Sequence, residues 1–169
     1  MVSSPTLDAR EQRVWDALAS IADPEIPAIS LVDLGVIGEV RIGPELVHVE
    51  LLPTFVGCPA IEVMRQQIGE RLTELGVADR VEVEVSFATP WTSERISVAG
   101  REQLRGSGFA PPVMEGGDGL DVLAVMPIAE CPYCGSRNTT LDNPFGPTLC
   151  RAIHHCADCR QPFEQFKRV

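Results

Sequence analysis

Cys131-Pro132-Tyr133-Cys134 and Cys156-Ala157-Asp158-Cys159 lie near the C-terminus of a 169-residue chain. Each motif holds two residues between its cysteines, and 21 residues separate the motifs. Two such pairs in a short segment predict a closed tetrahedral site, in which four thiolates bind one Zn²⁺ at about 2.3 Å. A segment this short cannot fold on an apolar core alone. The spacing therefore predicts a zinc ribbon over residues 124–169.

The predicted role of this metal is structural, because four thiolates leave no position open to water or substrate. A rubredoxin-like iron or an iron–sulfur cluster is the alternative occupant of the same ligands. Cys150 could replace one of the thiols or be a small buried residue, and we favour burial because two complete pairs already satisfy the metal. The adjacent His154 and His155 would point to opposite faces of a strand, so we interpret them as strand residues. Gly135, directly after the first pair, gives the backbone the freedom that such a turn needs.

Residues 1–105 show apolar patterns that alternate between helical and strand spacing. The patterns predict helices over 6–22, 61–75 and 93–104, a hairpin of strands over 36–42 and 46–52, and a strand over 81–87. The order α-β-β-α-β, with a weaker final helix, predicts an α+β fold in which a small sheet and its helices form a two-layer sandwich. The Gly- and Pro-rich residues 106–123 are interpreted as a linker or extended arm.

The composition excludes several classes of partner and compartment. The chain carries 24 acidic and 14 basic residues, and its net charge of −10 argues against nucleic acid as a partner. No apolar run approaches the ~20 residues that a membrane span needs, and the N-terminus lacks the pattern of a signal peptide. Six cysteines without a signal peptide favour a reducing cytoplasm and metal or thiol chemistry over disulfides.

A second candidate site surrounds Cys58, in the segment that joins a predicted strand to the helix over 61–75. Proline is favoured at the first position of a helix, so Pro59 predicts that Cys58 is the N-cap residue. A thiol at a helix N-terminus has a lowered pKa and is a candidate metal ligand or reactive group. The alternative interpretation is a buried cysteine that packs beneath the loop.

Acidic residues upstream of this loop have two interpretations. Asp23, Glu25 and Asp33 stand beside prolines or glycines, where carboxylates commonly stabilise turns. They could also lie near Cys58 as ligands or hydrogen-bond partners. His48 falls within a predicted strand and is interpreted as structural.

The first domain contains the motifs Asp23-Pro24-Glu25, Asp33-Leu34-Gly35 and Leu52-Pro53-Thr54 with Cys58-Pro59. Together they resemble the MIP18-like family, which includes the SufT-type iron–sulfur assembly factors. Later motifs are Pro90-Trp91-Thr92, Gly108-Phe109-Ala110-Pro111-Pro112, the four ribbon cysteines, Phe145-Gly146-Pro147-Thr148 and Pro162-Phe163-Glu164. These resemble the narrower PaaD family, also called PaaJ, and the likeness runs from about Val14 to Lys167.

The resemblance implies a role in aerobic phenylacetate catabolism. PaaD proteins are associated with phenylacetyl-CoA 1,2-epoxidase, a multicomponent di-iron oxygenase whose reductase component carries an iron–sulfur cluster and a flavin. The resemblance implies an accessory or maturation subunit that assists iron or iron–sulfur assembly, with the reductase as partner and no catalytic activity of its own. Carried over by motif, the sites that handle iron or a cluster are Cys58, Asp23, Glu25, Asp33 and Thr54. The chain departs from the broader family by having Pro53-Thr54 where that family has Thr-Pro.

Two other functions remain open from the sequence. The chain could be a non-catalytic scaffold, in which zinc stiffens a docking ribbon of the oxygenase complex. It could also be a thiol-dependent hydrolase, although no motif places a histidine base near Cys58. Apolar residues in the arm (Phe109, Val113 and Met114) predict an exposed partner surface or a homodimer contact.

Overall fold

The computed structural model describes residues 9–113 and 128–168. The chain divides between Trp91 and Thr92 into two compact units, which are described separately. The domain limits expected from the sequence, at 105 and 123, stay predictions. Within the described ranges, no helix is long and apolar enough to cross a membrane.

The described part of the first unit, residues 9–91, contains three helices and one three-stranded sheet. The helices are α1 (Ala9–Ala19), α2 (Leu31–Leu34) and α3 (Ile61–Glu74), and the strands are β1 (Ile37–Ile42), β2 (Leu46–Leu51) and β3 (Arg80–Val85). The strand order is β1-β2-β3. The first two strands form the predicted antiparallel hairpin, and α3 is the crossover that brings β3 parallel to β2. The predicted α+β class is confirmed.

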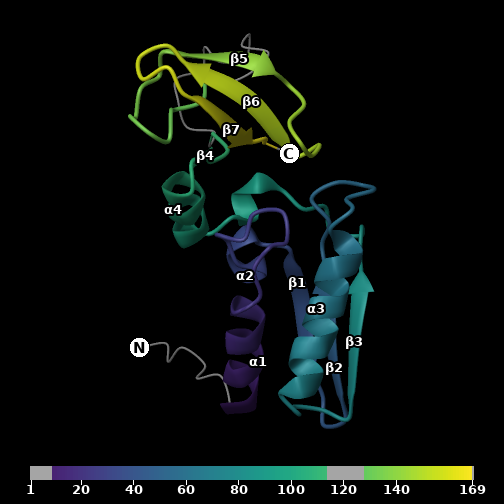
Figure 1. Ribbon diagram of the computed structural model, residues 1–169. Helices are drawn as coiled ribbons and strands as arrows, with labels where there is room; N and C mark the ends of the chain where they lie inside the picture. The colour runs from purple at the N-terminus through teal and green to yellow at the C-terminus, as the bar shows by residue number, and fades with distance from the viewer. Residues whose placement is uncertain (1–8, 114–127, 169) are drawn as a thin grey trace, which may run out of the picture. The chain divides into compact units, whose positions relative to one another are not determined.

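The helices lie against one face of this sheet, so the unit has two layers (Figure 1). Apolar residues at helical spacing in α1 and α3 are buried together with alternate residues of β2. The buried side chains include Val14, Leu18, Val47, Val49, Met64, Ile68 and Leu72. Arg10 also fixes the start of α1, because its guanidinium donates to the carbonyl oxygens of Val77 at 2.8 Å and Gly43 at 2.6 Å.

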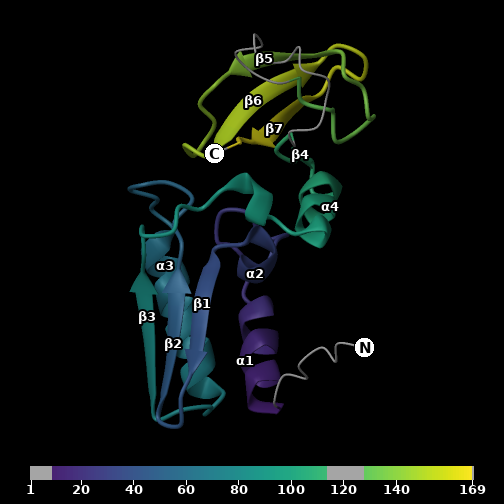
Figure 2. The same ribbon diagram turned by 180° about the vertical axis from the view of Figure 1, so that it is seen from behind.

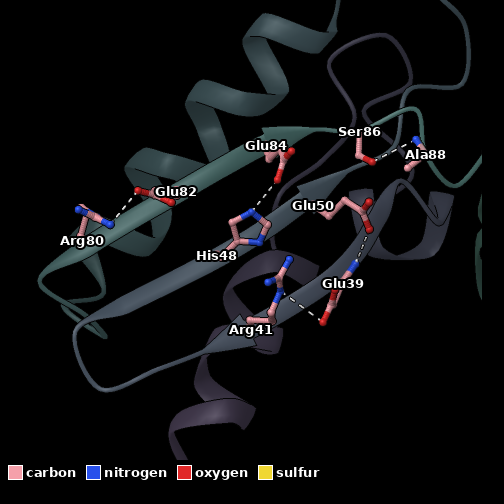
Figure 3. A network of polar contacts seen from close by, with 9 residues as sticks. All are labelled: Glu39, Arg41, His48, Glu50, Arg80, Glu82, Glu84, Ser86 and Ala88. Atoms are coloured by element: carbon pink, nitrogen blue, oxygen red, sulfur yellow. Dashed lines mark hydrogen bonds and ion pairs between the residues drawn. The ribbon is translucent and has the colours of Figure 1, made fainter.

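The helices leave the opposite face of the sheet uncovered (Figure 2), and polar side chains lie on it (Figure 3). On this face His48 Nε2 lies 3.0 Å from a carboxylate oxygen of Glu84 (Figure 3). The Glu50 carboxylate folds over Gly38 and accepts the N–H of Glu39 at 3.0 Å, where a Cβ on Gly38 would collide with it. His48 thus lies in a strand, as predicted, with its side chain largely covered on the polar face of the sheet.

Three details of the first unit differ from the sequence predictions. Helix α1 ends at Ala19, three residues before the predicted end at 22, and residues 6–8 of the predicted helix lie outside the described residues. The short helix α2 was not predicted; Ser30 caps it by accepting the N–H of Asp33 at 3.0 Å, and Gly35 ends it with φ of +74°. Strand β3 ends at Val85, so Phe87 is 57 % exposed instead of continuing the buried face.

The second unit begins with a 3₁₀ turn (Ser93–Arg95) and α4 (Val98–Gly106), where the sequence predicted one helix over 93–104. The break has a local cause. Ser97 is extended and its hydroxyl accepts the N–H of Gly100 at 2.9 Å, so it begins a new helix.

The ribbon forms a four-stranded sheet in the order β4-β7-β6-β5. Its strands are β4 (Phe109–Ala110), β5 (Thr139–Asn143), β6 (Arg151–Cys156) and β7 (Pro162–Phe166). The pairs β5–β6 and β6–β7 are antiparallel, whereas β4 runs parallel to β7. The start of the predicted arm is therefore an edge strand of the ribbon sheet.

Phe109 is half-buried with the Arg151 guanidinium 5.7 Å above its ring, so the prediction that it is exposed is wrong. Met114 lies outside the described residues.

Candidate functional site

The four ribbon cysteines converge on one point. The sulfurs of Cys131, Cys134, Cys156 and Cys159 all lie within 4.8 Å of one another. The Cys131–Cys159 and Cys134–Cys156 sulfur pairs are each 3.6 Å apart. Four sulfurs bound at about 2.3 Å to a central Zn²⁺ would be about 3.8 Å apart in a regular tetrahedron. The arrangement thus fits one tetrahedral ion and leaves no ligand position for a substrate.

Both cysteine motifs are built as matching turns. The carbonyl of Cys131 accepts the N–H of Gly135 at 2.9 Å, and the carbonyl of Cys156 accepts the N–H of Arg160 at 2.9 Å. The residue after each motif has positive φ, +73° at Gly135 and +60° at Arg160. The predicted use of Gly135 is confirmed. Backbone N–H groups of Cys159 and Asp158 point at Cys156 and lower the pKa of this thiol to about 7, whereas burial and hydrogen bonds to neighbouring sulfurs raise the pKa of Cys134 and of Cys159.

A polar clasp joins the two turns independently of any metal. Asp158, inside the second motif, accepts hydrogen bonds from Ser136 Oγ at 2.5 Å and from Asn138 Nδ2 at 2.7 Å. The N–H of Ala157 donates to the carbonyl of Asn138 at 2.9 Å. Hydrogen bonds around ligand residues hold the ligands in the geometry of the bound metal.

The other candidate ligands of the ribbon, Cys150, His154 and His155, are not part of the sulfur cluster. Cys150 is half-buried, and its sulfur is 3.1 Å from Thr148 Oγ1. His154 is buried and stacks on Phe163 with ring centroids 5.5 Å apart, while His155 points to the other, more exposed face of β6. Burial lowers the pKa of His154, so it stays neutral at pH 7. Among the described residues, the group that could hold a metal consists of the four motif cysteines, as the sequence predicts.

The loop between β2 and α3 contains the second candidate, Cys58. Gly57 has φ of +82°, a conformation that favours glycine, and the half-buried Cys58 follows it. The carbonyl of Cys58 accepts the N–H of Ile61 at 3.4 Å, which closes a turn through Pro59 and Ala60 before the helix begins. The N-cap of α3 is therefore Ala60, and the prediction that Cys58 occupies this position is wrong.

The direction of the Cys58 pKa is also opposite to the prediction. Burial raises the pKa of this thiol, and the nearby carboxylates of Asp23 and Glu25 raise it further. The backbone N–H groups of Ala60 and Ile61 favour the thiolate, but they do not overcome burial. Cys58 is thus a protonated thiol at neutral pH, and a bound metal would have to displace its proton.

The acidic residues of the signature have separate positions. Asp23 is buried and accepts the N–H groups of Glu25 and Ile26, both at 2.8 Å, so it shapes the turn that also places it near Cys58. Asp33 accepts the hydroxyl of Ser30 at 2.9 Å and stabilises the start of α2. Both aspartates therefore stabilise turns, and Asp23 also lies near Cys58, as the second interpretation expects. Thr54 lies half-buried in the same loop as Cys58.

Comparison with known proteins identifies both parts of the chain. A model described as the PaaD zinc beta ribbon domain matches residues 120–167, and a model described as iron–sulfur cluster assembly protein matches residues 11–85. A protein of Escherichia coli (strain K12) assigned as a subunit of 1,2-phenylacetyl-CoA epoxidase is 36 % identical over 157 residues, which cover 92 % of each chain. The chain belongs to the PaaD family.

Two more distant relatives each match somewhat more than half of this PaaD-family chain. The iron–sulfur protein maturation auxiliary factor YitW of Bacillus subtilis (strain 168) is 26 % identical over 91 residues, covering 53 % of this chain and 88 % of the relative. The crystal structure of a domain of unknown function from Bacillus anthracis superimposes with a TM-score of 0.53 at 25 % identity, covering 57 % of this chain and 92 % of that one. The ribbon of the PaaD family and the four converging sulfurs identify a structural zinc site.

Proposed function

We propose that this chain is an accessory subunit of phenylacetyl-CoA 1,2-epoxidase that assists the assembly of an iron or iron–sulfur centre in that complex. Its relative in Escherichia coli is assigned as a subunit of the epoxidase, and its first unit matches an iron–sulfur assembly model. The partner that we propose is the reductase component, since the cluster to be assembled lies there. The setting would be the cytoplasm.

The observation that carries the proposal is the position of Cys58. The thiol lies half-buried in a turn at the end of β2, beside the carboxylates of Asp23 and Glu25. The closed zinc site has no free ligand position, so it is unsuited to accept and release a cargo ion. In contrast, Cys58 can bind a soft metal after losing its proton, and the burial that raises its pKa favours release of the metal again.

The test is to replace Cys58 by Ser and to measure the iron and sulfide content of the reductase purified from cells that express the variant. We expect a reductase with a reduced cluster content. Cys150→Ser is the matched control, because Cys150 is equally half-buried but lies in the ribbon. A full cluster content with Cys58→Ser would remove the assembly role of this thiol.

A scaffold function is the second candidate, and exposed apolar side chains on the ribbon favour it. Tyr133, Phe145 and Leu149 are each more than half exposed. The variant Phe145→Ser/Leu149→Ser leaves the cysteines in place, so it separates docking from zinc binding. If the ribbon is a docking module, this variant should no longer co-elute with the epoxidase complex on gel filtration, although it still binds zinc. A complex that retains the variant would refute the scaffold function.

A further inference from the structure

Charged residues are absent from two segments of the first unit. Residues 51–60 and 85–91 contain no Asp, Glu, Lys or Arg, although 22 % of the chain is charged. Acidic residues outnumber basic ones in the rest of this unit. The two uncharged segments therefore contrast with the surface around them.

Both segments leave the sheet at the same edge. Strands β2 and β3 are parallel, and their last residues, Leu51 and Val85, stand side by side. The N–H of Ser86 donates to the carbonyl of Leu51 at 2.9 Å, which holds the two segments together where the strands end. Figures 1 and 2 both show the loop before α3 and the end of β3 at this edge. Cys58 lies in the first of the two segments.

Exposed apolar side chains come from the segments that meet at this edge. Among the described residues of the first unit, the large apolar side chains that are markedly exposed are Val56 at 80 %, Phe87 at 57 % and Val63 at 45 %. Val56 and Phe87 come from the two uncharged segments, and Val63 is in the first turn of α3. Single exposed apolar residues are ordinary, but several of them on segments that meet at one edge indicate an interaction surface. We call Val56, Val63 and Phe87 the thiol-edge surface.

The first unit around the thiol-edge surface is acidic, with 15 Asp and Glu against 6 Arg in residues 1–91. Glu25 lies near enough to Cys58 to act on it electrostatically, whereas Asp23 is buried and Glu62, beside Val63, is paired with Arg65. A partner that covers the apolar side chains would therefore meet negative charge at the border of the contact. Lysine or arginine at the border of the partner face would complement that charge and speed association.

We propose that the thiol-edge surface docks a protein with an apolar contact face bordered by Lys and Arg, and that docking brings the acceptor site of this protein next to Cys58. This proposal rests on the proposed assembly function. Apolar contacts around Cys58 would exclude water from the thiol, as the desolvated centres of protein interfaces do. The partner class is a protein because the exposed side chains project from a loop and a strand end, where they suit contact with another surface.

The test uses the full-length zinc-loaded protein and each purified epoxidase component, with binding measured at low and at high salt. The variant is Val56→Ser/Phe87→Ser, and its fold is checked by thermal unfolding. Val98→Ser is the matched control, since Val98 is 78 % exposed at the start of α4 in the other unit. We expect one component to bind the wild type and the control alike, and to bind the double variant at least tenfold more weakly. Binding should weaken at high salt.

Equal binding of the double variant and the wild type would overturn the proposal, and so would binding of no component. Loss of a wild-type dimer in the double variant, measured by sedimentation, would assign the surface to a second copy instead. Cys58→Ser, tested in parallel, separates this proposal from the assembly function. A Cys58→Ser variant that binds normally but fails to support cluster assembly would support both the docking surface and the assembly role of the thiol. If the Cys58→Ser variant supports assembly while the double variant does not bind, the docking surface is supported and the assembly role of Cys58 is refuted.

Discussion

Removal of zinc should unfold the ribbon and leave the first unit folded. The apolar core around the zinc ligands is small: among residues 92–113 and 128–168, and apart from Cys131 and Cys156, its buried members are Ala110, Ala129 and Phe163. Burial of one Phe and two Ala contributes about 4 kcal/mol at the usual value for apolar groups. Ordering the ten residues of the two turns, 131–135 and 156–160, costs about 15 kcal/mol at about 1.5 kcal/mol per residue. The deficit of about 11 kcal/mol lies within the ~10–16 kcal/mol that a structural Zn²⁺ supplies.

The measurement is hydrogen exchange followed by mass spectrometry, before and after treatment with a strong chelator. Elemental analysis of the same samples would confirm the zinc content. Peptides of β5, β6 and β7 should lose protection, whereas peptides of β2 and α3 should keep it, because their core contains no metal ligand. A zinc-free protein with a protected ribbon would refute the reasoning. Loss of protection in α3 would refute the independence of the two units.

Four further outcomes are expected. Asp158→Ala removes the hydrogen bonds from Ser136 and Asn138, so it should speed the transfer of zinc to a coloured chelator by on the order of tenfold. Asp142→Ala is the same change at an exposed site of β5 and should leave the transfer rate unchanged. Alkylation of Cys58 should accelerate as the pH rises beyond the ordinary thiol pKa of about 9, since only the thiolate reacts and its folded pKa is raised. Glu25→Gln removes a nearby negative charge, so it should lower this pKa and speed alkylation at pH 8; an unchanged rate would contradict the electrostatic coupling. Leu72→Ala empties a fully buried site in α3 and should destabilise the first unit by about 2–5 kcal/mol in urea unfolding, without changing the zinc content.

Periodic patterns and cysteine spacing predicted most of the elements. The helix over 61–75 and the hairpin follow from apolar residues at regular intervals, and the zinc ligands follow from paired cysteines. Elements too short to show a periodic pattern were not predictable in this way. Helix α2 has four residues and depends on a cap by Ser30, and β4 has two residues that pair with a strand far along the chain. One hydroxyl, that of Ser97, divides the predicted helix over 93–104.

The chemistry of Cys58 shows a different limit of sequence reasoning. The prediction of a lowered pKa used only the neighbours of Cys58 in the chain, where Pro59 indicated a helix start. The structure adds two influences that the local sequence does not contain. One is burial beneath the loop, and the other is the approach of Asp23 and Glu25 from a distant turn. Both favour the neutral thiol, and together they reverse the predicted direction.

The pairing of β4 with β7 has a consequence for how such a ribbon could be exchanged between proteins. Ala110 of β4 is 1 % exposed and belongs to the same small core as the zinc ligands. A ribbon transplanted from residue 124 onward would lack this residue, and the backbone of β7 would be left as an open edge for intermolecular pairing. The shortest segment that carries the complete sheet therefore begins at or before Phe109. A recombination event within residues 111–123 would separate β4 from the other three strands.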